Sequence, residues 1–452
     1  MRRPYGLGGA LQEINLNASI DLAFDALSND RLAVLCGAGL SMAPPSSLPS
    51  AATLAQRAKQ KYDAQFGVTR GPLPPAIEDQ AEFFFERDEL QTVFLRRLID
   101  HNAFAAPSNA GHVALADLLI VNGIKTAVTT NVDFLIEAAG QRLFGHVGAG
   151  IDGDSVARLL PDVAPLLKLH GCRQIDPDNT VWAKGQISAP PVSDRIASST
   201  AWLEPRLLDR DLVVVGFSTD WDYLNDILGK SLGAVRPTRV LIVDPADPAG
   251  FQAKAPNLFQ LGQRAKVSFS YLRQSGSEFL SQLRWNFSNS IVRQVLHCGS
   301  QAFEDATGQA PTQAILEPPS LDNETLWQIR RDLEGKHPNE PSLARHSPQE
   351  PLLGATLLQL RHAGAAADGP FWLMGNQRVR VLKASNEPLH RIEAAFERGI
   401  APSIAPDITI AVGAERQQLA ANVARATTAS TIARGNKTRW VTRLEAIAEL
   451  NI

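Results

Sequence analysis

Short runs of apolar and β-branched residues alternate with longer amphipathic stretches over roughly the first 290 residues. The apolar runs predict β-strands, because each is too short for a helix and is bounded by glycine or polar residues. Strands that are apolar on both faces and separated by helices are typical of a parallel sheet covered on both sides. We therefore predict a doubly wound, Rossmann-like α/β domain over residues 1–290. Strands are expected at 31–36, 126–130, 166–170, 212–217 and 239–243, and helices at 51–66, 77–100, 111–122 and 134–143.

The pattern changes near residue 308. Six prolines between 308 and 350 interrupt any long helix, although 324–334 still has helical spacing. We interpret 291–350 as a helix followed by a Pro-rich linker or arm. Residues 351–452 then predict a small C-terminal α/β domain that serves as an adaptor or in oligomerisation. Its expected elements are two strands within 370–385, a helix at 391–398, a strand at 407–412 and mostly helix over 415–450.

Composition narrows the class of protein. Of 452 residues, 44% are hydrophobic and 20% are charged, which is ordinary for a folded globular chain and excludes wholesale disorder. The net charge of −3 excludes a nucleic-acid-like or membrane-like field over the whole molecule. Three widely spaced cysteines favour neither a disulfide framework nor a four-cysteine zinc site. The apolar runs are too short to span a bilayer and no signal peptide is recognisable, so we expect a cytoplasmic protein without membrane contact.

The first candidate for chemistry is the turn that follows the strand at 31–36. Gly37, Ala38, Gly39 and Ser41 form a Gly-x-Gly turn in which backbone amides could approach a pyrophosphate. The third glycine of the usual dinucleotide fingerprint is missing, because position 42 is methionine. A tight strand-to-helix connection explains the same residues, and that alternative stays open.

Polar or glycine residues also follow three other predicted strands. The carboxyl ends of parallel strands meet at one edge of a sheet, where open α/β sheets bind their ligands. Each position has a plainer alternative, namely a helix cap for the asparagine and aspartate and a turn for the glycine. Four such strand ends together favour one shared crevice. The residues are Thr130, Asn131 and Asp133 after the second strand, His170 after the third, and Gly216 and Ser218 after the fourth.

These motifs, in this order and spacing, resemble the SIR2 (sirtuin) superfamily over roughly residues 20–285. The matching segments are 37–41, 107–116, 129–133, 168–171 and 216–218, and 46–50 resembles the loop after the phosphate-binding turn. Protein-deacylating members carry a four-cysteine zinc module soon after the catalytic histidine. Here only Cys172 lies between His170 and Ser218, so that module cannot be built. The chain is therefore similar to the zinc-free, NAD-cleaving effectors of bacterial antiphage defence.

The resemblance implies hydrolysis of NAD+ to nicotinamide and ADP-ribose, with NAD+ as substrate and no metal. It implies that Asn131 holds the nicotinamide ribose or the attacking water, and that His170 takes a proton from the water or a ribose hydroxyl. Asp133 and Ser218 would bind ribose hydroxyls, and the amides of 38–41 would hold the diphosphate. Asp244 ends the strand at 239–243 and could bind the adenine ribose, as an acidic residue does in dinucleotide folds, or simply form a turn before Pro245. We interpret His112 as a core histidine.

Partners follow from the resemblance and by elimination. A homo-oligomer is expected, with a partner protein from a neighbouring gene, for which a HerA-type ATPase is favoured over a short Argonaute. Contact with nucleic acid is expected only through that partner. Between 413 and 445 there are six basic and two acidic side chains, typical of a solvated helical face or of a surface for an acidic partner. Two other functions stay open, a non-catalytic NAD or ADP-ribose-binding scaffold subunit and an NAD-dependent protein deacylase.

Overall fold

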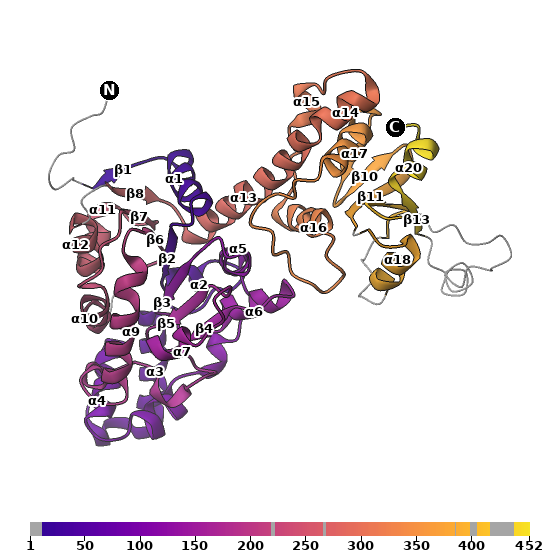
Figure 1. Cartoon of the computed structure of the whole chain (residues 1–452). Coiled ribbons are helices and arrows are strands. Elements are labelled where there is room, and N and C mark those ends of the chain that lie inside the picture. Colours follow the sequence, from indigo (N-terminus) through magenta and orange to yellow (C-terminus); the bar gives the residue numbers. More distant parts are fainter. Residues whose placement is uncertain (1–10, 218–221, 265–267, 385, 398–404, 416–437) are drawn as a thin grey trace, which may run out of the picture. The chain divides into compact units, whose positions relative to one another are not determined.

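The computed structural model describes residues 11–217, 222–264, 268–384, 386–397, 405–415 and 438–452 (Figure 1). The chain divides into two compact units, Met1–Leu283 and Arg284–Ile452. No helix of the described residues combines the length and the apolar character needed to cross a bilayer.

The first unit contains an eight-stranded sheet in which every pair of neighbouring strands is parallel (Figure 1). The strand order is β1-β8-β7-β6-β2-β3-β5-β4, so the chain order reverses beside β2 and opens a crevice at the carboxyl ends of β2, β3 and β6. The predicted doubly wound α/β class is confirmed. The strands are β1 Gln12–Glu13, β2 Leu32–Cys36, β3 Thr126–Thr129, β4 Gly148–Gly150, β5 Pro165–Lys168, β6 Asp211–Val215, β7 Arg239–Asp244 and β8 Ser268–Arg273.

Both faces of this sheet are buried, which is why its strands are apolar throughout. Ala33 and Leu35 of β2 point into the core formed with α9, α10 and α12, while Val34 between them is equally buried on the opposite face. Alternate residues of a strand point to opposite faces, so both sides must be covered by helices. The helices of this unit are α1 Leu16–Ser28, α2 Gly39–Met42, α3 Ala51–Phe66, α4 Ile77–Phe85, α5 Ala110–Ile120, α6 Leu135–Arg142, α7 Gly153–Ala157, α8 Lys184–Ile187, α9 Val192–Leu207, α10 Asp222–Leu232, α11 Pro248–Lys254 and α12 Pro256–Arg264, with α13 Gly276–Cys298 continuing into the second unit.

A helical insertion lies between β2 and β3 and has a core of its own. The helix predicted at 51–66 is confirmed as α3, whereas the predicted helix at 77–100 is divided into α4 and a π-helix, η2 Leu90–Leu98. Asp88 adopts a left-handed φ of 54° between them, which a continuous helix does not allow. Tyr62, Phe84 and Phe94 fill this core together with Trp182 from the segment after β5. The insertion ends in a short 3₁₀ turn, η3 His101–Phe104.

The second unit is built on a five-stranded sheet of order β13-β12-β11-β10-β9, in which β11, β12 and β13 are parallel. Its strands are β9 Ala366–Asp368, β10 Phe371–Met374, β11 Gln377–Lys383, β12 Ile408–Val412 and β13 Arg439–Thr442. Its helices, besides the end of α13, are α14 Ser300–Thr307, α15 Gln313–Leu316, α16 Asn323–Glu334, α17 Pro351–His362, α18 Leu389–Glu397 and α20 Arg443–Leu450.

One expectation for this unit is corrected. Residues 291–350 are not a linker or arm, because Leu326 and Leu333 of α16 share one core with Val379 of β11 and Ile410 of β12. The prolines lie in the connections between short helices and leave α16 intact. Most of the helix expected over 415–450 lies outside the described residues; of the described part, β13 occupies 439–442 and α20 occupies 443–450.

Most of the basic stretch lies outside the described residues. Of its two described arginines, Arg443 donates to Thr356 Oγ1 and Gln359 Oε1, both at 3.0 Å, and Arg439 is paired with Glu449. Both side chains therefore already have intramolecular partners.

Candidate active site

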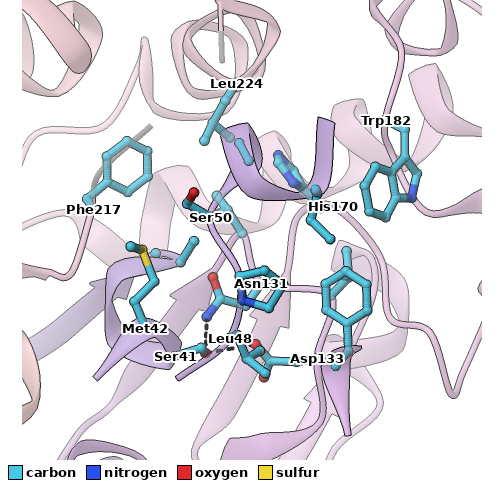
Figure 2. Close-up of a pocket in the computed structure, with 18 of the residues that line it drawn as sticks. Ser41, Met42, Leu48, Ser50, Asn131, Asp133, His170, Trp182, Phe217 and Leu224 are labelled. Carbon is cyan, nitrogen blue, oxygen red and sulfur yellow. Dashed lines mark hydrogen bonds between the residues drawn. The ribbon is translucent and has the colours of Figure 1, made fainter. Parts of the chain in front are cut away.

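One pocket of about 240 Å³ lies at the carboxyl edge of the large sheet, in the crevice beside β2 (Figure 2). Seven of the predicted site residues line it, and they come from the ends of β2, β3 and β5. The strand ends that look unrelated in the sequence are thus brought together as expected from parallel strands. The seven residues are Gly37, Ala38, Ser41, Thr130, Asn131, Asp133 and His170.

Gly39 and Gly216, by contrast, are needed for close packing. The Gly39 amide donates to the Gly216 carbonyl at 2.6 Å, and a Cβ on Gly39 would lie 2.6 Å from that oxygen. Gly216 has a φ of +59°, and a Cβ there would lie 2.4 Å from the Leu40 amide nitrogen. Neither glycine lines the pocket, and both let the turn after β2 lie against the end of β6; their contact with a cofactor stays a prediction.

Asp244 does not line the pocket either, and its predicted contact with the adenine ribose stays a prediction. It ends β7 and is buried, and its carboxylate accepts the Ala246 backbone N–H at 2.8 Å. Burial raises the pKa of this carboxyl group, and Lys254 opposes the shift. The turn before Pro245, which was the alternative interpretation, is what the structure contains. Ser218 lies outside the described residues.

A buried hydrogen-bond network centres on the Ser41 hydroxyl (Figure 2). Asp133 Oδ2 lies 2.8 Å from Ser41 Oγ, and an ionised carboxylate can only accept, so the hydroxyl donates to it. Ser41 Oγ must then accept from its two other neighbours, Asn131 Nδ2 at 3.0 Å and His112 Nε2 at 3.1 Å. The hydroxyl uses its single proton and both lone pairs.

The network fixes the protonation of His112, which is a core histidine as interpreted from the sequence but also contacts the site. The backbone N–H of Asn109 donates to His112 Nδ1 at 3.2 Å, so the ring proton sits on Nε2 and points to Ser41. Burial lowers the pKa of His112 to about 4, with Asp133 opposing the shift, and the ring is neutral at pH 7. The Asn109 side chain in turn caps α5 by accepting from Gly111 and His112.

The same network fixes the orientation of the Asn131 amide. Because Nδ2 donates to Ser41, Oδ1 is on the other side of the amide, and Figure 2 shows it pointing away from Ser41. Asn131 is 6% exposed, and Oδ1 accepts no hydrogen bond from the described residues. A buried acceptor without a partner costs about 1–3 kcal/mol, so it indicates that a ligand or water supplies the donor. The Asp133 carboxylate is less available to a ligand, since its second oxygen, Oδ1, accepts the Leu135 backbone N–H at 3.1 Å.

His170 lies two residues beyond β5 and is buried at 3% exposure. Burial, together with the charge of Arg195, lowers its pKa to about 3. A Cβ on the following residue, Gly171, would lie 3.1 Å from Arg195 Nη1, which places this guanidinium against the residue next to the histidine. The imidazole is therefore neutral at pH 7 and keeps one unprotonated ring nitrogen.

A buried ion pair supports the floor of the site. Lys168, the last residue of β5, donates to Glu137 Oε1 at 2.8 Å and also to the backbone carbonyl of Asp133. Both charged side chains are almost fully buried, at 1% and 5% exposure. Burial lowers the pKa of Lys168, but the charges of Glu137, Cys172 and Asp133 and the hydrogen bond to Glu137 together outweigh it and raise the pKa, so the lysine stays charged. The pair ties the end of β5 to the first turn of α6 and to the loop carrying Asn131.

The remaining walls are mainly apolar, and their residues were not predicted as site residues from the sequence. Their residues carry no polar pattern that would single them out, and several come from the insertion or from helices far along the chain. Lys254, at the end of α11, adds a positive charge. The unpredicted lining residues are Met42, Leu48, Pro49, Ser50, Ala51, Leu54, Phe104, Val132, Val181, Trp182, Phe217, Leu224 and Lys254.

No protein-family model matches the chain, and no curated protein matches it in sequence. Among solved structures, the chain is similar to a Sir2 homolog in complex with NAD, at 16% identity and a TM-score of 0.35, over 61% of this chain and 95% of that one. It is also similar to Sir2Tm bound to a propionylated peptide, at 15% identity and a TM-score of 0.33, over 59% and 98% of the two chains. A Sir2 complex with an inhibitor, 2′-O-acetyl-ADP-ribose and a peptide matches at 16% identity and a TM-score of 0.32, over 58% and 97%.

Proposed function

We propose that this protein is an NAD+ glycohydrolase, which cleaves NAD+ to nicotinamide and ADP-ribose. The observation that carries the proposal is the buried Asn131 Oδ1. The hydrogen bond to Ser41 turns this oxygen toward the pocket, and it accepts no hydrogen bond from the described residues. A ribose hydroxyl, or the water that attacks the ribose, is a donor of the right kind for this oxygen. The pocket lies at the strand-order reversal, where α/β sheets bind nucleotides.

The other lining groups suit the rest of the substrate. The backbone at Gly37 and Ala38 leads into α2 and can approach a diphosphate closely, and Lys254 supplies a cation to the same pocket. Nicotinamide leaves as a neutral ring from a cationic precursor, so the leaving group needs no general acid. The site must instead stabilise an oxocarbenium-like ribose and deliver water to it. Neutral His170 takes the proton that the water loses, and Asn131 positions the water or the ribose.

Hydrolysis is favoured over deacylation by the cysteine count. The sequence resemblance links deacylation to a four-cysteine zinc module, and the whole chain has only Cys36, Cys172 and Cys298. Cys36 and Cys172 are buried, and burial raises the pKa of the Cys36 thiol to about 12. These cysteines cannot replace the module.

A cell cannot tolerate an enzyme that empties its NAD+ pool, so the proposal includes gating. We infer that the protein acts in bacterial antiphage defence as a homo-oligomer, in an abortive-infection response. We infer further that a neighbouring gene encodes its partner, with a HerA-type ATPase favoured and a short Argonaute as the alternative.

Nicotinamide release tests the proposal. The purified full-length chain, with and without the product of its neighbouring gene, is incubated with NAD+ and followed by liquid chromatography. We expect release in the assembled state and a loss of about 10²–10⁴-fold for His170→Ala, the usual effect of removing a general base. Asn131→Ala should be inactive as well.

His146→Ala is the matched control, because His146 is exposed and lies outside the pocket. No release in any assembled state, together with measurable NAD+ binding by calorimetry, would favour a non-catalytic scaffold. Release that depends on an acyl-lysine peptide would favour a deacylase. Near-normal turnover by His170→Ala would show that the assigned mechanism is wrong.

A further inference from the structure

The pocket wall beside His170 is built from a tightly held apolar segment that the reaction so far does not explain. After β5 the chain turns at Gly171, which has a φ of +82°, and returns so that the Val181 N–H donates to the His170 carbonyl at 2.9 Å. Val181 and Trp182 consequently line the same pocket as His170. Figure 2 shows Trp182 on the His170 side of that pocket.

Hydrogen bonds and ring contacts hold Trp182 in place. Its indole N–H donates to Thr180 Oγ1 at 3.0 Å, and its backbone N–H donates to Gln186 Oε1 at 2.8 Å. The rings of Phe94 and Phe104 pack edge-on against it, each with a centroid separation of 6.3 Å. The side chain is 3% exposed. A residue held by two hydrogen bonds and two ring contacts does not swing aside to admit a bulky molecule.

Among the described residues, the wall formed by Phe104, Val132, Val181 and Trp182 offers no unused side-chain hydrogen-bonding group to an acceptor molecule larger than water. Phe104, Val132 and Val181 are apolar, and the single donor of Trp182 is already used by Thr180. An extended peptide needs backbone hydrogen-bond partners along its path, and a sugar needs donors and acceptors for its hydroxyls. Beside His170, only a small acceptor avoids an unpaired polar group or a clash.

We propose that Trp182 is a specificity-determining residue that restricts the acceptor of the ADP-ribosyl group to water by filling the space beside His170. The inference rests on the proposed glycohydrolase function. In the step concerned, the C1′–N1 bond of NAD+ breaks and its electron pair leaves with neutral nicotinamide. A bond then forms from the acceptor oxygen to C1′, and the acceptor proton passes to His170 and on to solvent. With water the product is ADP-ribose, and with an alcohol it is an O-alkyl ADP-riboside.

Partition between water and benzyl alcohol tests the proposal. Trp182→Ala should leave an apolar space, and an apolar cavity of about 150 Å³ in a protein core admits a benzene-sized ring. The full-length chain, assembled with its partner, is given NAD+ and benzyl alcohol, and O-benzyl ADP-riboside and ADP-ribose are quantified by mass spectrometry. We expect the ratio of riboside to ADP-ribose to be at least about tenfold higher in Trp182→Ala than in the natural chain.

Phe84→Ala is the matched control. It removes a fully buried ring that stacks on Phe94 in the same core and does not line the pocket, so it perturbs that core while both ring contacts of Trp182 are kept. Its product ratio should stay at the natural value. Trp182→Leu, which keeps an apolar side chain and the backbone bond to Gln186, replaces Trp182→Ala if thermal denaturation shows that the latter does not fold.

The outcomes separate the two proposals. Nicotinamide release by the natural chain, with equal product ratios in the natural chain and both Trp182 variants, would overturn the role of Trp182 and leave the glycohydrolase intact. A ratio of O-benzyl ADP-riboside to ADP-ribose that is already high in the natural chain would also overturn the role of Trp182. Absence of nicotinamide release from the natural chain in every assembled state would overturn the glycohydrolase and this inference with it.

Discussion

The ion pair beneath the site makes a quantitative prediction about stability. Lys168 and Glu137 are 1% and 5% exposed, and their charges are joined at 2.8 Å. Lys168→Met removes the ammonium and leaves the Glu137 carboxylate buried without a counter-charge. Breaking a buried pair from one side costs about 3–5 kcal/mol. For a unit of this size, each kcal/mol lowers the melting temperature by about 2–4 °C, so a drop of roughly 10 °C is expected.

The double variant separates the charge effect from simple loss of packing. Lys168→Met with Glu137→Leu replaces both charges by apolar groups, a change that is often neutral or stabilising. The Asp133 carbonyl still loses its donor, at about 1 kcal/mol. We therefore expect the double variant to be more stable than Lys168→Met alone, with a recovery of at least about 2 kcal/mol.

Calorimetry of the first unit's transition and urea unfolding measure these differences. The exposed pair Lys59–Asp63 provides the control, since Lys59→Met should cost less than about 1 kcal/mol. If the double variant is as unstable as Lys168→Met, or if Lys168→Met costs no more than Lys59→Met, the buried charge does not control stability and the reasoning fails.

Two further predictions concern backbone packing and pH. Gly216→Ala should destabilise the first unit by more than Gly71→Ala. Both glycines have a positive φ, but only a Cβ at position 216 would meet backbone, 2.4 Å from the Leu40 amide nitrogen. Equal melting temperatures of the two variants would contradict this close approach. His170 has a pKa of about 3 when folded and about 6.5 when unfolded, so its contribution to stability is complete above pH 6.5 and is lost as the pH falls toward 3. Between pH 7.5 and pH 5 the free energy of unfolding should fall by about 2 kcal/mol from this group. Urea unfolding should show a smaller fall in His170→Asn. An unchanged pH dependence of stability in the variant would refute the low pKa of His170.

The sequence alone determined the class of fold and one side of the site. Runs such as 212–217 are apolar on both faces, and only a parallel sheet covered by helices buries such strands. Once the strands are parallel, their carboxyl ends share one edge, so Asn131 and His170 were predicted together although they are 39 positions apart in the chain. The cap of α5 by Asn109 is equally local, because a side chain and the next three residues are enough to form it.

Contacts between distant segments could not be predicted, because they depend on how whole elements pack. Gly39 and Gly216 look like ligand-binding glycines in the sequence, and only the approach of two turns shows that each leaves room for the other. Asp244 has the right residue type at the right strand end, yet its carboxylate is used by its own turn. The prolines between 308 and 350 suggested an arm, but the short helices between them bury apolar side chains in a core that no local pattern reveals.

The same division holds within the pocket. The polar residues at the strand ends that line the pocket carry a recognisable pattern, so the sequence determined them. The position of Trp182, the proton on His112 Nε2 and the outward face of Asn131 Oδ1 were decided only by the tertiary structure. Each depends on a hydrogen bond or ring contact with a neighbour that folding brings close: Phe94 and Phe104 for the indole, Asn109 and Ser41 for the imidazole, and Ser41 for the amide. Spacing along a chain fixes which residues share a strand end, whereas the direction of a side chain is fixed by what surrounds it.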